Sequence, residues 1–142
     1  MNIHHMLSIS QHIIDSICEH ARLGLPEEVC GYLAGTGKEV LRQFTMTNID
    51  HSPEHFSFDP AEQFHVLREA RKAGLEILAN YHSHPETPAR PSEEDIRLAY
   101  DPNISYVIVS LAVDLPTIKS FRILNGEVEK EEIQVIGGGS SS

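Results

Sequence analysis

The spacing of hydrophobic residues in the first part of the chain predicts one helix followed by a pair of strands. From residue 8 to residue 24 apolar side chains recur at helical spacing, and a glycine follows as a suitable C-terminal stop: Ile9, Ile13, Ile17, His20 or Ala21, then Gly24. Residues 29–35 (VCGYLAG) form a short apolar run that is typical of a strand. Residues 39–47 follow after a Thr-Gly-Lys turn, so the two segments are expected to pair as a hairpin.

The middle of the chain predicts an irregular loop and then a second helix. Residues 48–58 have no hydrophobic period and are expected to form the loop. The helix is expected over residues 59–74, because Asp59 can cap its start, Pro60 suits its first position and Gly74 can close it. Its inward face is expected to carry Phe64, Leu67 and either Ala70 or Arg71.

The remaining segments predict a sheet with one short helix. Residues 75–82 (LEILANYH) and 104–112 are mostly apolar and are expected to be central strands, with a short helix at 91–100 between them. Residues 117–124 and 127–135 flank Asn125-Gly126, a strong signal for a two-residue hairpin turn. This order of elements predicts an α/β (mixed α+β) fold with a central mixed β-sheet flanked by helices.

Length and composition narrow the classes of protein that the chain can belong to. With 142 residues, it is expected to form one domain over residues 1–136, and residues 137–142 (GGGSSS) have the composition of a flexible linker such as a cloning remnant. A formal net charge of −10 gives no cationic surface for nucleic acid or an anionic membrane. No membrane-spanning segment or export signal is visible, and two cysteines are too few for a disulfide framework. The expected location is cytoplasmic.

Histidine is abundant, with nine in the chain, but most of these residues have no pattern that indicates metal binding. His51 and His55 have the i,i+4 spacing of two ligands on a helix, but Pro53 between them favours extended backbone and a loop. Four others fall in or before the first predicted helix and are interpreted as structural: His4, His5, His12 and His20.

His82 and His84 form the one histidine pair whose spacing suits a rigid site. They lie at the end of a predicted strand, where residues i and i+2 point to the same face. Two imidazoles on one strand can supply two nitrogen ligands to a metal ion. For a bare pair of this kind, however, a polar, solvent-facing strand end is the simpler interpretation.

Asp95 and Ser92 follow in the next predicted helix. The Ser-Glu-Glu-Asp run (92–95) resembles a capping box, with Ser92 at the N-cap and a carboxylate three residues later. That structural role does not exclude a chemical one, because a helix start below the strand end could direct Asp95 at the histidines. Three protein ligands and an open position are typical of catalytic zinc, and two histidines with a carboxylate also suit non-haem iron.

The four residues together resemble a known motif. His82-Ser83-His84, then seven residues to Ser92 and two more to Asp95, is similar to the JAMM (MPN+) metallopeptidase signature H-[ST]-H-x7-S-x2-D. The resemblance extends over essentially the whole chain before the tail. It implies the JAMM/MPN (cytidine-deaminase-like) architecture, and it favours the small prokaryotic single-domain members of the family.

An upstream glutamate completes the family pattern. Spacing alone leaves Glu27 and Glu28 as equal candidates, and the family context E-x-C-G, matched by residues 28–31, selects Glu28. In that context Cys30 is interpreted as a buried residue beside the site and not as a nucleophile.

The resemblance implies a role for each residue. His82, His84 and Asp95 are expected to hold one Zn²⁺ per chain, Glu28 to act as general base and then general acid, and Ser92 to stabilise the oxyanion.

The implied substrate is a ubiquitin-like or sulfur-carrier protein, cut after its C-terminal Gly-Gly. Two alternatives remain open at this point: a non-catalytic interaction scaffold of the same fold, and a metal-dependent hydrolase of small amides.

Overall fold

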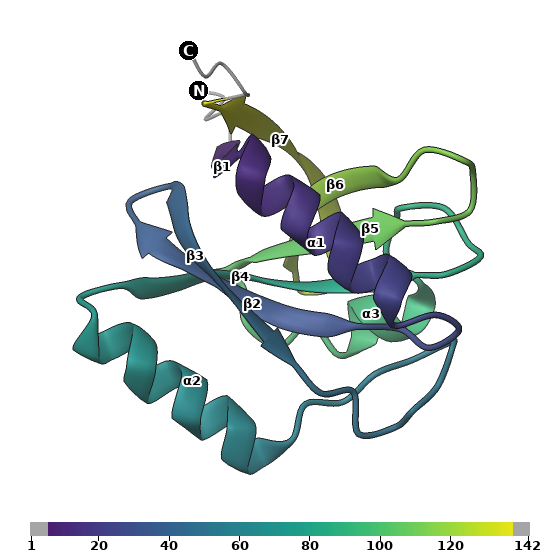
Figure 1. The fold of residues 1–142 in the computed structure, drawn as a ribbon, viewed down its shortest axis with the longest axis horizontal. Coiled ribbons are helices and arrows are strands. Elements are labelled where there is room, and N and C mark those ends of the chain that lie inside the picture. Colours follow the sequence, from purple (N-terminus) through teal and green to yellow (C-terminus); the bar gives the residue numbers. More distant parts are fainter. Residues whose placement is uncertain (1–5, 138–142) are drawn as a thin grey trace.

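The computed structural model describes residues 6–137, which form three helices and seven strands (Figure 1). In chain order the elements are β1 (Met6–Ser10), α1 (Gln11–Leu23), β2 (Cys30–Thr36), β3 (Glu39–Met46), α2 (Pro60–Lys72), β4 (Glu76–His84), α3 (Glu93–Arg97), β5 (Ser105–Ser110), β6 (Thr117–Leu124) and β7 (Glu127–Ile136). His4, His5 and the tail beyond Gly137 lie outside the described residues. None of the described helices is long and apolar enough to cross a membrane.

The strands form one mixed sheet in the order β1-β3-β2-β4-β5-β6-β7, which closes because β1 also pairs with β7. The β4–β5 pair is parallel, whereas β2 pairs antiparallel with both β3 and β4. The predicted mixed sheet with flanking helices is confirmed. Its central strand, β4, carries His82 and His84 at its C-terminal end.

Two hydrophobic layers cover opposite faces of this sheet. On one face α1 packs its buried isoleucines against Leu33, Ala79 and Val107. On the other face α2 contributes Val66 to a cluster with Cys30 and Tyr32, and residues of and after α3 pack against β5 and β6. Figure 1 shows α1 on one side of strands β2 and β4 and α2 on the other. The second face is the one that carries the two histidines.

The start of α1 differs from its prediction. Residues 6–10 form a strand, and the helix begins at Gln11, with the Ser10 hydroxyl accepting a hydrogen bond from the Ile13 N–H at 3.2 Å. Ile9 therefore lies in β1, where it is fully buried. This strand is held by parallel pairing with β7, at the far end of the chain, and a five-residue strand with a distant partner leaves no local pattern.

The inward face of α2 was also predicted wrongly in part. Phe64 and Leu67 are 62% and 42% exposed, whereas Val66 and Ala70 are buried. Val66 and Ala70 are four residues apart and form the narrow stripe that contacts the sheet. The larger side chain of Phe64 lies instead under the Arg68 guanidinium, 5.8 Å from its ring centre.

The turn signals of the sequence are confirmed. The Asp59 carboxylate accepts a hydrogen bond from the Ala61 N–H at 3.0 Å, which caps α2, and Gly74 follows the helix with a φ of 75°. Asn125 and Gly126 have φ values of 52° and 80°, as the two-residue turn between β6 and β7 requires. Residues 48–58 form a loop with one isolated bridge, between Asn48 and Phe58.

We expect Gly31→Ala to destabilise the fold through overpacking. A Cβ atom at Gly31 would lie 2.4 Å from both the Phe44 carbonyl oxygen and the ring of the fully buried Tyr81. Overpacking of this kind costs about 1–3 kcal/mol, measurable as a lower midpoint in urea or thermal unfolding. The control is Thr45→Ala, at the exposed position opposite Gly31 in the β2–β3 register. Equal unfolding midpoints for the two variants would contradict the expectation.

Candidate active site

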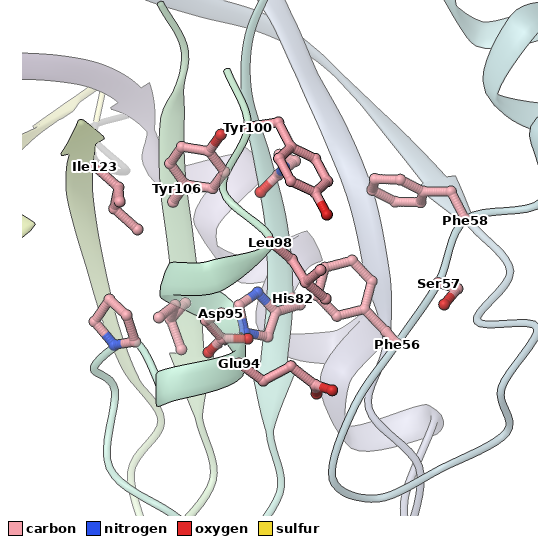
Figure 2. A pocket seen from close by; sticks show the side chains of 13 residues that line it. Phe56, Ser57, Phe58, His82, Glu94, Asp95, Leu98, Tyr100, Tyr106 and Ile123 are labelled. Atoms are coloured by element: carbon pink, nitrogen blue, oxygen red, sulfur yellow. Dashed lines mark hydrogen bonds and ion pairs between the residues drawn. The ribbon is translucent and has the colours of Figure 1, made fainter. Parts of the chain in front are cut away.

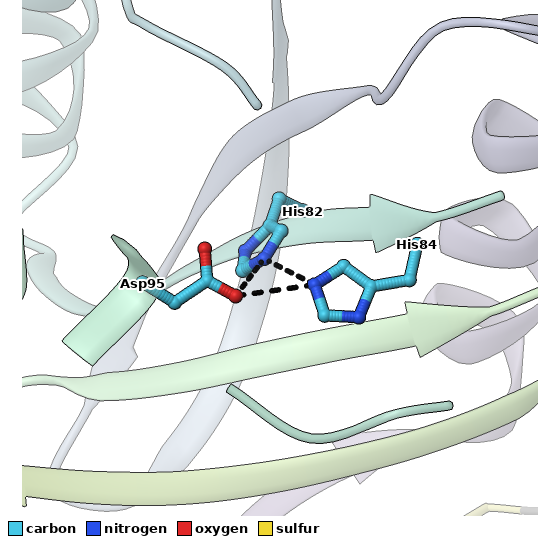
Figure 3. Close-up of side chains that lie close together, drawn as sticks. All are labelled: His82, His84 and Asp95. Atoms are coloured by element: carbon cyan, nitrogen blue, oxygen red, sulfur yellow. Dashed lines mark hydrogen bonds and ion pairs between the residues drawn. The ribbon is translucent and has the colours of Figure 1, made fainter. Parts of the chain in front are cut away.

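His82 and His84 project from the end of β4 toward each other. Their side chains lie on the same face of the strand, as the spacing predicts, and both residues are at most 5% exposed. The two Nε2 atoms are 3.1 Å apart, with the rings at 60° (Figure 3). A solvent-facing strand end is therefore excluded for this pair.

Asp95 reaches the histidines from the first turn of α3. The predicted capping box is confirmed: the Ser92 hydroxyl accepts from the Asp95 N–H at 3.0 Å, and the Ser92 N–H donates to Asp95 Oδ2 at 2.9 Å. The same Oδ2 atom lies 3.1 Å from the Nε2 atoms of His82 and His84. The hydrogen bonds that cap the helix thus orient the carboxylate at the two imidazoles.

The protonation pattern of this cluster favours a cation. His84 Nδ1 must donate to the Pro88 carbonyl at 2.8 Å, so in the neutral ring Nε2 presents its lone pair to the cluster. Burial opposes charge on Asp95, but its hydrogen bonds with His82 and His84 hold its pKa well below the usual range. Burial also opposes charge on His84, but its hydrogen bonds with Asp95 and the Pro88 carbonyl and the negative charges of Asp95 and Glu28 together outweigh burial and raise the pKa of His84.

The geometry of the cluster fits a small metal ion. Among the described residues, these three form the group whose ligand atoms lie close enough to hold one, all within 4.8 Å of one another. A tetrahedral ion bound at about 2.0–2.1 Å keeps its donor atoms about 3.3 Å apart, close to the three separations here. His82, His84 and Asp95 could therefore hold a metal with one position left open.

Glu28 lies on the same face, immediately before β2. The Val29 N–H donates to Ser83 Oγ at 2.8 Å and the Ser83 N–H donates to the Val29 carbonyl at 3.0 Å. This exchange continues the β2–β4 register and brings Glu28 beside His84. The side chain of Glu28 is buried, and its Oε1 atom has no hydrogen-bond partner among the described residues.

Burial raises the pKa of Glu28 to about 8. Two smaller effects act in opposite directions: the charge of His84 lowers this pKa and the charge of Asp95 raises it. Glu27, the equal candidate on spacing, instead turns to the surface, where its carboxylate lies 3.3 Å from His51 Nδ1. The structure therefore separates the two glutamates, and Glu28 is the one that faces the cluster.

Cys30 and the loop histidines take no part in the cluster. Cys30 is fully buried, and burial raises the pKa of its thiol to about 12, so the thiolate needed by a nucleophile is scarce at neutral pH. His51 and His55 lie in the predicted loop, and His55 Nδ1 is 3.1 Å from Asp50 Oδ2.

Two residues that the sequence did not indicate support the site. Phe56 stacks on the imidazole of His82, with ring centres 4.7 Å apart. Asn48 is buried, and its Nδ2 atom donates to the carbonyl oxygens of Glu28 and His55, both at 3.0 Å. Both residues lie in or beside a loop without periodicity, so no sequence pattern marked them.

A comparison with known families places this site in context. The model of prokaryotic homologs of the JAB domain (Prok-JAB) matches residues 10–124. The chain belongs to this family. The predicted resemblance is confirmed, and the matched region includes all five predicted site residues.

Three curated relatives align with most of this chain. It is 35% identical to the CysO-cysteine peptidase of Mycobacterium tuberculosis over 135 residues, which is 93% of this chain and 92% of the relative. It is 36% identical to the desampylase of Haloferax volcanii over 111 residues, or 73% and 80% of the two chains. A probable TtuB-protein conjugate cleaving protease of Thermus thermophilus is 34% identical over 66% of this chain and 64% of the relative.

Solved structures confirm the JAMM/MPN architecture. A solution structure of a Desulfitobacterium hafniense protein is 47% identical, with a TM-score of 0.84 over 92% of each chain. A JAB1/MPN domain protein of Archaeoglobus fulgidus shares the fold at 23% identity, with a TM-score of 0.61 over 92% of this chain and 96% of the neighbour.

We expect Glu28→Gln to stabilise the metal-free protein increasingly as the pH rises. The pKa of Glu28 is about 8 in the folded protein against about 4.5 for an exposed carboxyl. Between these values the unfolded chain loses the proton first, so wild-type stability falls as pH rises, whereas glutamine has no proton to lose. Thermal unfolding of chelator-treated protein at pH 5 and pH 7.5 measures the difference.

The control for this measurement is Glu27→Gln, because Glu27 is exposed beside His51. A Glu28→Gln advantage of the same size at both pH values would show that burial does not raise the pKa of this carboxyl.

Proposed function

We propose that this protein is a zinc metallopeptidase or isopeptidase of the JAMM type. Its proposed reaction is hydrolysis of the bond after the C-terminal Gly-Gly of a ubiquitin-like or sulfur-carrier protein. The observation that carries the proposal is the convergence of His82, His84 and Asp95 within 3.1 Å of one another, on the face where Glu28 is buried.

The relatives support the reaction class. The curated relatives are named as a CysO-cysteine peptidase, a desampylase and a TtuB-protein conjugate cleaving protease. Together with family membership, these names support a hydrolase that acts on a ubiquitin-like carrier protein or its conjugates. The identity of the metal and the Gly-Gly specificity are our proposal.

We assign the metal site to His82, His84 and Asp95. Two imidazole nitrogens and one carboxylate oxygen are the ligand types of catalytic zinc sites with an open fourth position. Bound zinc supplies Lewis acidity and a water of lowered pKa at that position. The His84–Pro88 hydrogen bond then fixes the tautomer in which Nε2 is the ligand atom.

We assign proton transfer to Glu28. Its carboxylate takes a proton from the attacking water and returns it to the leaving amine. Burial prepares Glu28 for this role, because a pKa of about 8 lets it exchange a proton near neutral pH. Its unpaired Oε1 atom is available to a reacting group.

We assign oxyanion stabilisation to Ser92. The cap uses a lone pair of the Ser92 hydroxyl to accept from the Asp95 N–H at 3.0 Å. The hydroxyl hydrogen therefore stays free to donate to the developing oxyanion. Capping and catalysis use different parts of one side chain.

We expect purified wild type to bind one equivalent of zinc and to trim a ubiquitin-like protein that carries an extension after Gly-Gly. Glu28→Gln should retain the zinc and lose cleavage, because it removes the proton acceptor and no ligand. Asp95→Ala should lose both, because it removes a ligand. Metal analysis and intact-protein mass spectrometry measure the two properties.

Two outcomes would count against this proposal. Wild type that binds no zinc after reconstitution contradicts the metal site. Zinc-loaded wild type that trims no carrier protein but cleaves small amides supports a small-amide hydrolase, and one that cleaves neither supports a scaffold.

We expect Ser92→Ala to lower kcat by about 100- to 1000-fold, as loss of one oxyanion donor does. Loss of the N-cap should cost about 1 kcal/mol of stability in the same variant. Steady-state kinetics and urea unfolding separate the effects, and Asp59→Ala is the matched control because it removes the cap of α2 and no residue assigned to the reaction. A fall in kcat of similar size in both variants would make the effect of Ser92 structural.

A further inference from the structure

A pocket opens beside the cluster, on the side of His82 and Asp95 (Figure 2). Its volume is about 240 Å³, larger than the cavity of about 150 Å³ that holds a benzene molecule. The walls are mostly apolar and come from three parts of the chain: the loop before α2 (Phe56, Phe58), α3 and the segment after it (Leu98, Tyr100), and the sheet (Tyr106, Ile108, Ile123).

Asn80 is the polar residue that the sheet contributes to this pocket besides His82. It precedes His82 by two positions on β4, so both side chains lie on the same face. The Oδ1 atom of Asn80 is buried and accepts no hydrogen bond from the described part of the chain. A buried amide in an apolar wall ordinarily has a partner, so this one is available to a ligand.

The tyrosines on either side of Asn80 do not act as that partner. Asn80 lies between Tyr32 on β2 and Tyr106 on β5 in the sheet register. The Tyr32 hydroxyl accepts from Gln63 at 2.6 Å, and the Tyr106 hydroxyl donates to the Asp101 carbonyl at 2.7 Å. Both hydroxyls thus have other partners, and neither is hydrogen-bonded to Asn80 Oδ1.

The position of Glu28 indicates which part of a substrate would enter the pocket. His82 and Asp95 line the pocket, whereas Glu28 and His84 do not. The leaving amine must lie near Glu28, because it receives its proton there. The pocket therefore lies on the acyl side of the bond that is cleaved.

We propose that Asn80 binds the main chain of the substrate on this acyl side, with Oδ1 accepting a hydrogen bond from a substrate peptide N–H. The inference rests on the proposed function. Glycine offers no side chain to recognise, so a Gly-Gly tail can be selected only through its backbone and through walls that enclose it. A primary amide has the acceptor and donor that a peptide group complements.

The strand geometry limits which peptide group is bound. Asn80 and His82 are two residues apart, or about 6.6 Å along the strand. An extended substrate advances about 3.3–3.6 Å per residue, so the bound N–H lies about two residues before the cleaved bond. Aromatic walls on both sides suit a flat, extended backbone.

The test replaces single peptide bonds of the substrate by esters, which lack the N–H. We expect the ester about two residues before the cleaved bond to lower kcat/KM of wild type by on the order of 10- to 100-fold. Asn80→Leu should show a similar loss with the all-amide substrate and no further loss with the ester. Ser57→Ala is the matched control, because Ser57 lines the same pocket but its hydroxyl already donates to Asp50 at 2.8 Å.

Three kinetic outcomes would overturn the inference. In the first, the ester lowers kcat/KM of Asn80→Leu as much as that of wild type. In the second, Ser57→Ala loses the effect of the ester as completely as Asn80→Leu does. In the third, the only ester whose effect disappears in Asn80→Leu lies on the leaving side of the cleaved bond. Asn80→Ser serves as a second variant if leucine prevents folding, because its shorter side chain cannot reach the same N–H.

A binding experiment keeps the inference separate from the proposed reaction. Glu28→Gln protein is titrated with a six-residue peptide that ends in Gly-Gly, and the side-chain amide resonance of Asn80 is followed by NMR. We expect this resonance to shift with the amide peptide and to move much less with the ester peptide. Absence of cleavage by wild type contradicts the proposed function, whereas an unchanged Asn80 resonance at high peptide concentration contradicts the role of Asn80.

Discussion

The contacts of one oxygen atom, Asp95 Oδ2, hold the site together. This atom accepts the Ser92 N–H at the start of α3 and lies 3.1 Å from both imidazole nitrogens at the end of β4. A short helix has little stability of its own, so a cap that satisfies its first N–H groups decides where it begins. Because the capping carboxylate is also the group that faces the histidines, the start of the helix and the geometry of the cluster cannot vary independently.

Glu28 is joined to this cluster through the sheet and not through a motif. Ser83 points away from the histidines and exchanges hydrogen bonds with Val29, which fixes the register of the residue before it. Asn48 holds the Glu28 carbonyl from the loop side, and its Oδ1 atom accepts from the N–H groups of Asp50 and Ser57. The loop that places Phe56 on His82 is thus attached to the backbone of Glu28.

The sequence predicted those features that depend on neighbours along the chain. The capping box at Ser92 and the paired orientation of His82 and His84 follow from local geometry, and a fixed-spacing motif joins them. Strand β1 was missed because its partner β7 lies more than 100 residues later, and Phe64 was misplaced because only the packed sheet decides which stripe of α2 is inward. Asn80 and Phe56 gain their positions from three converging segments, which no local pattern records.

Asp95 and Glu28 lie on one side of the sheet, and their pKa values are shifted in opposite directions although burial opposes the charge of both. Burial penalises the charge of both, but Asp95 accepts from the Ser92 N–H and is hydrogen-bonded with His82 and His84, which outweighs this penalty, so it stays ionised. The Oε1 atom of Glu28 receives none, so burial prevails and its pKa rises to about 8. The hydrogen bonds of Asp95 account for its lowered pKa, and the contrast leaves one carboxylate suited to a cation and the other to a proton.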